Sequence, residues 1–257
     1  MTDRKPQTHI SGATDAVLSG DDTDDALEVL LDGLTDADQT GLRIDAPFVV
    51  DAGATALPVV GAFVRVPEAG EAFENEVAVI ATQGDAITVQ PALRSPKMKG
   101  GKKRPASDVI RGSNFAFDAL ARLSSVDFAV PTRLWVGYGP YLSNGVTVRV
   151  GGEAPLAPGG STSVSLEGPS SAPTEPGGTV TLSGTAPAST QVHIVALGGP
   201  DAFVSAVEAD GAGSFSVNLL GDNPLPKAPG TWHVYAFCGE HVAGPVSIEL
   251  TPGSKPW

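Results

Sequence analysis

The last third of the chain, from residue 162 to residue 251, contains seven short strand-like runs separated by turn signals. A period of two in apolar residues is the pattern of a β-strand that buries one face. In four of the runs the apolar residues share one face: Val180 and Leu182; Val192, Ile194 and Ala196; Phe215, Val217 and Leu219; Trp232, Val234, Ala236 and Cys238. Seven short strands in about 90 residues predict an immunoglobulin-like (Ig-like) β-sandwich over 162–251.

The preceding residues also predict β-structure, from about residue 46 onward. The runs APFVVDAG, LPVVGAFVRVPE, NEVAVIAT and DAITVQPAL alternate or stay apolar over strand length. Gly84-Asp85 lies between two of them and predicts a tight hairpin turn. A short helix is expected around Asp118–Leu123, followed by the strands RLWVGYG and GVTVRV with a turn at 143–145. The pattern predicts a β-barrel or sandwich body within 23–150, with one or two short helices.

Other segments differ from this β pattern. Residues 1–22 are polar and predict a disordered acidic tail, and 252–257 form a second tail. The sequence TDDALEVLLDGL starts at the potential N-cap Thr23 and has leucines at helical spacing: Leu27, Leu30, Leu31 and Leu34. We expect a short amphipathic helix there that contacts the body or a neighbouring subunit. GGEAPLAPGGS, residues 151–161, has no periodicity and predicts a flexible interdomain linker.

Composition narrows the class of protein further. The chain has a single cysteine, Cys238, so it contains no intrachain disulfide, and the alternation around it indicates an inward-facing thiol. The formal charge of −13 makes the whole chain a poor ligand for nucleic-acid phosphates. No apolar run has the length of a signal peptide or a membrane span. We therefore expect synthesis in the cytoplasm without a signal peptide, and neither membrane insertion nor specific nucleic-acid binding.

One basic stretch contrasts with the acidic chain. ALRSPKMKGGKKRPAS contains six basic residues and no acid: Arg94, Lys97, Lys99, Lys102, Lys103 and Arg104. Its glycines and flanking prolines favour a loop over 94–106, and the absence of aromatic residues argues against binding of single-stranded nucleic acid. A solvated loop is one interpretation. A contact with acidic surfaces of neighbouring subunits is the other.

No pattern predicts catalysis, a metal or a cofactor. Asp36, Asp38, Thr40 and Gly41 imitate the first half of an EF-hand loop, but Pro47 stands where the bidentate carboxylate belongs. A solvated turn that ends the helix is favoured there. Of the four histidines, His9 lies in the tail, while His193 and His233 alternate with the apolar face of their strands and should point to the outer surface. Nothing indicates that they converge with His241 on a zinc ion. The chain also lacks a phosphate-binding loop and a GxSxG motif, so we expect no enzyme activity.

The sequence of the last domain resembles bacterial and phage Ig-like modules, on the residues PGGTVTLSGTA, DGAGSFSVNL and GTWHVYAF. The whole arrangement is similar to siphophage major tail-tube proteins, in which a β-sandwich tube domain carries a C-terminal Ig-like domain on the outside. It also resembles capsid decoration or head-fibre proteins with Ig-like modules. Either resemblance implies a non-enzymatic virion protein that contacts copies of itself, as a ring or a trimer, and other virion proteins.

A third hypothesis is a carbohydrate-binding surface module. Such modules present exposed aromatic rings, and the aromatic cluster available for this lies in RLWVGYGPY: Trp135, Tyr138 and Tyr141. Packing of these rings within strands and turns is the favoured alternative.

Overall fold

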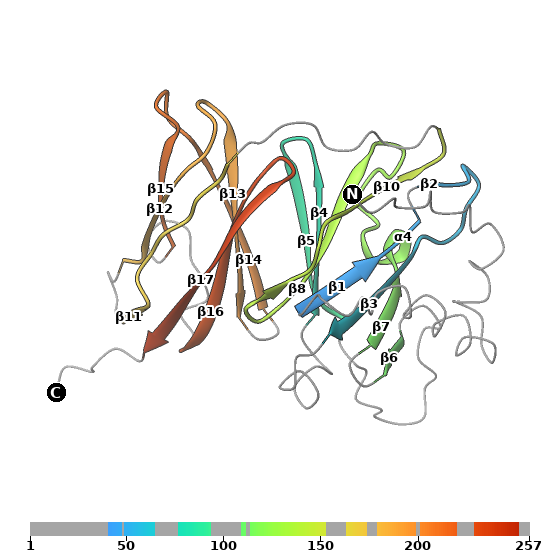
Figure 1. The fold of residues 1–257 in the computed structure, drawn as a ribbon, viewed down its shortest axis with the longest axis horizontal. Coiled ribbons are helices and arrows are strands. Elements are labelled where there is room, and N and C mark those ends of the chain that lie inside the picture. The colour runs from blue at the N-terminus through green and yellow to red at the C-terminus, as the bar shows by residue number, and fades with distance from the viewer. Residues whose placement is uncertain are drawn as a thin grey trace, which may run out of the picture.

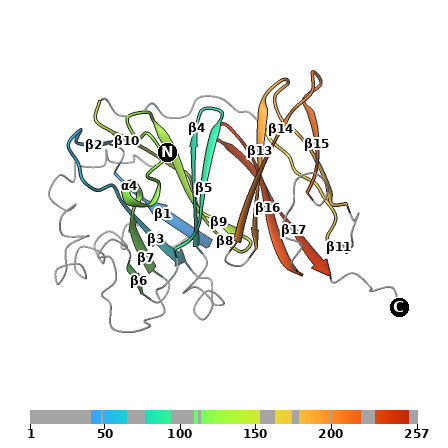
Figure 2. The same ribbon diagram turned by 180° about the vertical axis from the view of Figure 1, so that it is seen from behind.

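The computed structural model describes residues 41–47, 49–64, 77–93, 109–111, 114–152, 163–173, 179–198, 201–219 and 229–251. The predicted tails, the leucine helix at 23–34, the basic stretch 94–106 and most of the linker 151–161 lie outside these residues. Within them the chain is mainly β, as predicted, and α4 (Ala119–Arg122) is the only helix. Two β-sandwiches lie side by side (Figures 1 and 2).

The first sandwich contains two sheets. One has the order β1 (Gly41–Asp45), β3 (Pro58–Val64), β7 (Asn114–Asp118), β6 (Val109–Arg111). The other has the order β2 (Val49–Val50), β10 (Val146–Val150), β8 (Thr132–Tyr138), β4 (Val77–Gln83), β5 (Ala86–Leu93), and β9 (Tyr141–Leu142) pairs with β8. The pairing of β2 with β10 is parallel, and the other pairings are antiparallel.

The core of the first sandwich lies between these two sheets. It contains alternate residues of the strands, including Leu42, Ile44, Phe115, Phe117 and Val136, all of them buried. Each Å² of apolar surface that these side chains remove from water contributes roughly 25 cal/mol to the free energy of folding. Burial of this core is therefore the main contribution to the stability of the sandwich.

Two local predictions for the first sandwich are confirmed. Gly84 and Asp85 form the two-residue connection between β4 and β5, and Gly84 has a φ of 56° that glycine tolerates without strain. The expected helix around 118–123 is α4. The carboxylate of Asp118 caps it by accepting from the Leu120 N–H at 3.0 Å, and it also accepts from the Leu57 N–H at 2.9 Å.

One local prediction is wrong. Gly41 does not belong to a turn that ends a helix but begins strand β1. Leu42 and Ile44 point into the core while their neighbours are half-buried, and β1 pairs along its whole length with β3. The strand is short, and a ladder with residues 60–64, far along the chain, decides its conformation.

The second sandwich also contains two sheets. A five-stranded sheet has the order β11 (Ser171–Pro173), β17 (His241–Thr251), β16 (Gly230–Cys238), β13 (Gln191–Gly198), β14 (Asp201–Glu208). Opposite it, β12 (Thr181–Thr185) pairs with β15 (Ser214–Asn218). This is an Ig-like arrangement, and its core contains the predicted inward faces, including Val192, Phe215, Trp232 and Val234.

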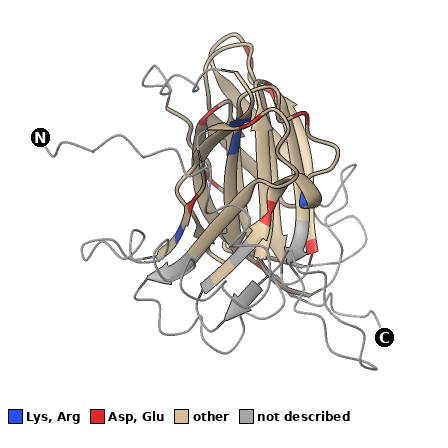
Figure 3. Ribbon diagram, turned by 90° about the vertical axis from the view of Figure 1, so that its right-hand side faces the viewer, with Lys and Arg blue, Asp and Glu red and all other residues tan. Residues whose placement is uncertain are grey.

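The first predicted strand of the second sandwich, in the region of residues 163–168, is not a regular strand. Residues 163–168 form only an isolated bridge, Glu167 with Ser183, supported by a hydrogen bond from the Ser165 N–H to the Thr185 carbonyl at 2.9 Å. The chain then changes sheets, and β11 pairs in parallel with the end of β17. Charged residues are scattered over the described strands and loops (Figure 3).

Candidate functional site: the seam between the two sandwiches

A third apolar cluster, here called the seam, joins the two sandwiches. Its buried members come from the outer faces of one sheet of each sandwich: Ala78, Ile80 and Trp135 from the first, and Val195, Leu197, Tyr235 and Phe237 from the second. Strand β4 and strand β13 are consequently buried on both faces. Domains move relative to each other by default unless their interface is large and hydrophobic. The seam therefore fixes one sandwich against the other.

Close packing in the seam depends on particular side chains. The rings of Trp135 and Phe237 meet edge to face, with centroids 5.2 Å apart and an interplanar angle of 74°. Gly137 on β8 lies directly against Leu197 on β13, and a Cβ at Gly137 would lie 2.5 Å from the Leu197 Cδ1. A side chain at position 137 would force the Leu197 side chain to move and would disturb the packing between the two sheets.

Polar contacts also cross the seam. The buried His193 ring bonds through Nε2 to the Asp85 carbonyl at 2.6 Å, and because a carbonyl only accepts, Nε2 carries the proton. The Tyr235 hydroxyl donates to the Gly139 carbonyl at 3.2 Å, and burial raises the pKa of this hydroxyl. The guanidinium of Arg133 lies 3.8 Å from the Glu240 carboxylate, a partly exposed pair that contributes little to stability.

The expectation that His193 faces the outer surface is wrong, because the first sandwich covers its ring. His233 also points away from the core of its own sandwich, and it is half-buried. His233 bonds through Nδ1 to the Ser247 hydroxyl at 2.9 Å, and burial lowers the pKa of its imidazole. The sequence held a signal for this, because Val195 and Leu197 make the second face of β13 apolar too.

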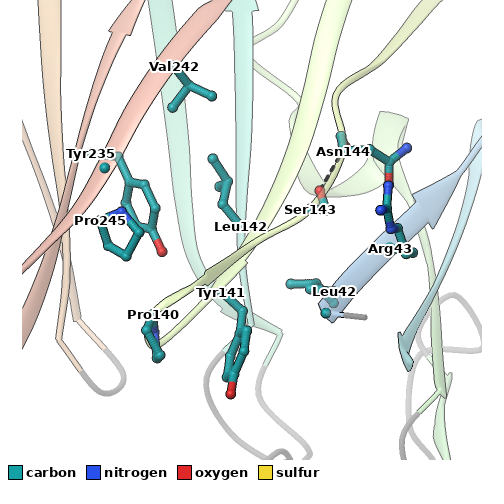
Figure 4. A pocket seen from close by; sticks show the side chains of 12 residues that line it. Leu42, Arg43, Pro140, Tyr141, Leu142, Ser143, Asn144, Tyr235, Val242 and Pro245 are labelled. Carbon is teal, nitrogen blue, oxygen red and sulfur yellow. Dashed lines mark hydrogen bonds between the residues drawn. The ribbon is translucent and has the colours of Figure 1, made fainter. Parts of the chain in front are cut away.

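A groove of about 380 Å³ opens at one end of the seam (Figure 4). Its lining includes Leu42, Arg43, Tyr141, Val242 and Pro245, and Arg43 is its only charged residue. Val242 is 38% exposed. The groove therefore combines apolar and aromatic side chains with the polar groups of Arg43, Ser143 and Asn144.

Asn144 shapes the wall of this groove. Its side-chain amide accepts from the Ile44 N–H at 3.0 Å and donates to the Ile44 carbonyl at 2.9 Å. The Asn144 side chain thus satisfies the backbone N–H and carbonyl of Ile44 at the free edge of β1, where a neighbouring strand could otherwise pair. This contact links the two sheets of the first sandwich at the groove.

The structure separates the aromatic residues that were predicted to bind a glycan. Trp135 is only 2% exposed and packs within the seam, so its ring is not available to a sugar in this arrangement. Tyr138 and Tyr141 are half-buried against the first core, and Tyr141 also lines the groove. Cys238 lies in the second core, where its thiol is 3.5 Å from the Thr190 hydroxyl. The predicted subunit contacts, Leu27, Leu30, Leu31 and the six basic residues of 94–106, lie outside the described residues.

Within the described ranges, no three His, Cys, Asp or Glu side chains lie close enough together to hold a metal ion. No helix in these ranges is long and apolar enough to cross a membrane.

Comparisons with known proteins add little to the fold itself. No family model matches the chain, and no curated protein matches it. Among solved structures, a tetra-tandem repeat in the extending region of a large adhesion protein is 14% identical, with a TM-score of 0.25, covering 82% of this chain and 49% of that one. The FN1–FN3 domains of chicken CNTN1 are 12% identical, with a TM-score of 0.23, covering 82% of this chain and 64% of that one. This chain thus spans less than two thirds of either. Scores this low carry no argument, and the Ig-like assignment rests on strand order.

Proposed function

We propose that the protein is a non-enzymatic structural subunit of a tailed-phage particle, first of all a tail-tube subunit that presents an Ig-like domain on the surface. The observation that carries the proposal is the seam. An appended module on a flexible tether would keep the outward face of this sheet polar, whereas here Val195, Leu197, Tyr235 and Phe237 are buried against the first sandwich. A fixed orientation suits a subunit that is repeated many times in an ordered particle.

The charge distribution supports the same proposal. The chain has a net charge of −13, while the stretch 94–106 has six basic residues and no acid. Opposite charges on separate segments favour contacts between neighbouring copies and disfavour random association. A predominantly acidic subunit also repels DNA, as a conduit for DNA requires. The proposed partners are copies of the same chain and other virion proteins.

Electron microscopy of the purified full-length protein tests the proposal. Rings or tubes in negative stain, with a matching mass in solution, support the tail tube. Small stable trimers, or binding to capsids, support the capsid decoration or head-fibre alternative instead. Monodisperse monomers under all conditions of salt and concentration would overturn both.

A pair of glycine variants tests whether assembly needs the seam. Gly137→Val inserts a side chain against Leu197, whereas Gly53→Val adds the same atoms in a loop of the same sandwich with nothing within 4 Å. We expect Gly137→Val to abolish rings or tubes while far-ultraviolet circular dichroism stays β-type, and Gly53→Val to assemble normally. Normal assembly of Gly137→Val would show that the protein assembles without the seam, and the seam would then no longer support the particle function.

Carbohydrate binding is the second candidate, because the groove combines an aromatic ring, Tyr141, with Arg43. Aromatic rings that stack on sugars must be accessible, and Tyr141 is the predicted glycan residue that lines the groove. Glycan-array binding that disappears with Tyr141→Ala would favour this function. An array without signal for the unmodified protein would exclude it.

A further inference from the structure

Strand β14 is a long edge strand of the second sandwich, and β5 of the first sandwich packs near Ala202 on one of its faces. It ends the five-stranded sheet, and among the described residues its only ladder partner is β13. The two strands pair one to one over all eight residues, from Gln191 with Glu208 to Gly198 with Asp201, and their register has no shift. Every second residue of such an edge directs its N–H and C=O away from the sheet, where another strand can bond to them.

Other edges in the described part of the chain are protected or short. β5 has eight residues but contains Pro91, which cannot donate, and its pairing with β4 shifts register. The free half of β17 contains Pro245. β1 is bonded by the Asn144 side chain. β6 and β11 have three residues each, and β15 has five. Strand β14 has neither proline nor lysine, the usual devices against edge pairing.

The exposed face of β14 is apolar. Val204 is 38% exposed and is one of only three large hydrophobic residues exposed in the described ranges. Ala206 on the same face is also exposed, and Ala202 is half-buried at the border of the seam. The order Ala202, Val204, Ala206 is the same in both directions, so the face matches a second copy of itself.

Side-chain direction limits the register of this pairing. Residues that pair across antiparallel strands point to the same face of the sheet, so a two-fold axis perpendicular to the sheet passes through a residue and not between two residues. An axis at Val204 places the apolar residues of this face opposite one another. It pairs Val204 with Val204, Ala202 with Ala206, and Asp201 with Val207.

We propose that two copies of the protein associate through antiparallel pairing of β14 with β14, centred on Val204, so that their five-stranded sheets form one continuous sheet. Such a two-fold contact is isologous and closes after two copies. The pairing goes beyond the proposed particle function and bears on the position of the subunit within the particle. Because a tail tube is polar, a two-fold pair has no place in its wall, whereas a capsid surface offers two-fold positions. Confirmation would therefore favour the capsid position over the tube.

Analytical ultracentrifugation of full-length variants tests the pairing. Val204→Lys places two ammonium groups opposite each other, and we expect it to raise the dimer dissociation constant by about tenfold or more. Val130→Lys is the matched control, since Val130 is 48% exposed and lies in the first sandwich. Val204→Thr keeps a β-branched side chain without charge and should still dimerise.

Every outcome of the experiment decides the question. A concentration-dependent dimer that Val204→Lys dissociates and Val130→Lys preserves supports the pairing. A monomer at all concentrations, an unchanged dimer in Val204→Lys, or equal loss in both lysine variants overturns it. Rings or tubes formed by the unmodified protein without any β14 dimer would overturn the β14 pairing alone and leave the particle function standing. A β14 dimer without any larger assembly would support the pairing and count against the particle.

Discussion

Replacement of Trp135 by alanine should weaken the coupling between the sandwiches without damaging either core. Trp135 is 2% exposed and belongs to the seam, not to the clusters inside the two sandwiches. A buried aromatic side chain removes roughly 150–250 Å² from water. At about 25 cal/mol per Å² this is worth roughly 4–6 kcal/mol. Alanine retains part of that area, so we expect a loss of about 3–5 kcal/mol in the free energy of unfolding.

Urea denaturation provides the assay. The chain has three tryptophans, so the experiment uses a Trp257→Phe background, in which Trp135 in the seam and Trp232 in the second core give the fluorescence and, after Trp135→Ala, Trp232 alone reports the second sandwich. Circular dichroism reports both sandwiches. In the unmodified protein the two signals should change together, because the seam couples the sandwiches. In Trp135→Ala they should separate into two transitions or move together to a lower midpoint.

A double-mutant cycle makes the test specific to the seam. Phe237→Ala removes the second ring of the edge-to-face pair, and the coupling energy between the two changes should be about 0.5–1.5 kcal/mol. Val130→Ala, at an exposed site, should change stability by less than about 0.5 kcal/mol. A loss below about 1 kcal/mol for Trp135→Ala, with the second sandwich unaffected, would refute the conclusion that the seam fixes the two sandwiches.

Three further perturbations test other contacts. Gly137→Val should increase the solvent accessibility of the seam, measured by hydrogen exchange, whereas Gly53→Val should not; equal exchange would contradict the packing argument. Burial lowers the pKa of His233 below its ordinary 6.5, so its contribution to stability is present above that value and is lost as pH falls through the lower folded-state pKa. His233→Gln should therefore flatten the pH dependence of the midpoint of urea unfolding at pH values below the ordinary histidine pKa of about 6.5, and an unchanged slope would exclude this histidine as its source. Asn144→Ala should cost about 1–3 kcal/mol, measured by urea unfolding, because it leaves the buried N–H and carbonyl of Ile44 without their partner; a loss below about 0.5 kcal/mol would mean that water replaces the amide.

The sequence by itself determined the features that depend on neighbours along the chain. Alternation in Phe215 and Val217 predicted which face of a strand is buried, because the period of two is a property of extended backbone. The Gly84-Asp85 turn and the helix after Asp118 were predictable for the same reason, since each depends on backbone preferences and capping within a few residues.

Only the tertiary structure decided what covers the second face of β13 and β16. Alternation assigns a residue to one of two faces but does not say whether solvent or another sheet lies there. The alternation thus placed His193 on the correct face of β13. It did not show that the first sandwich buries this face, where the His193 ring binds the Asp85 carbonyl. The seam exists because Trp135 and Gly137 fit in space against Leu197, which lies more than fifty residues further along the chain. Such a fit depends on the shapes of two complete sheets, and no local pattern in the chain encodes it.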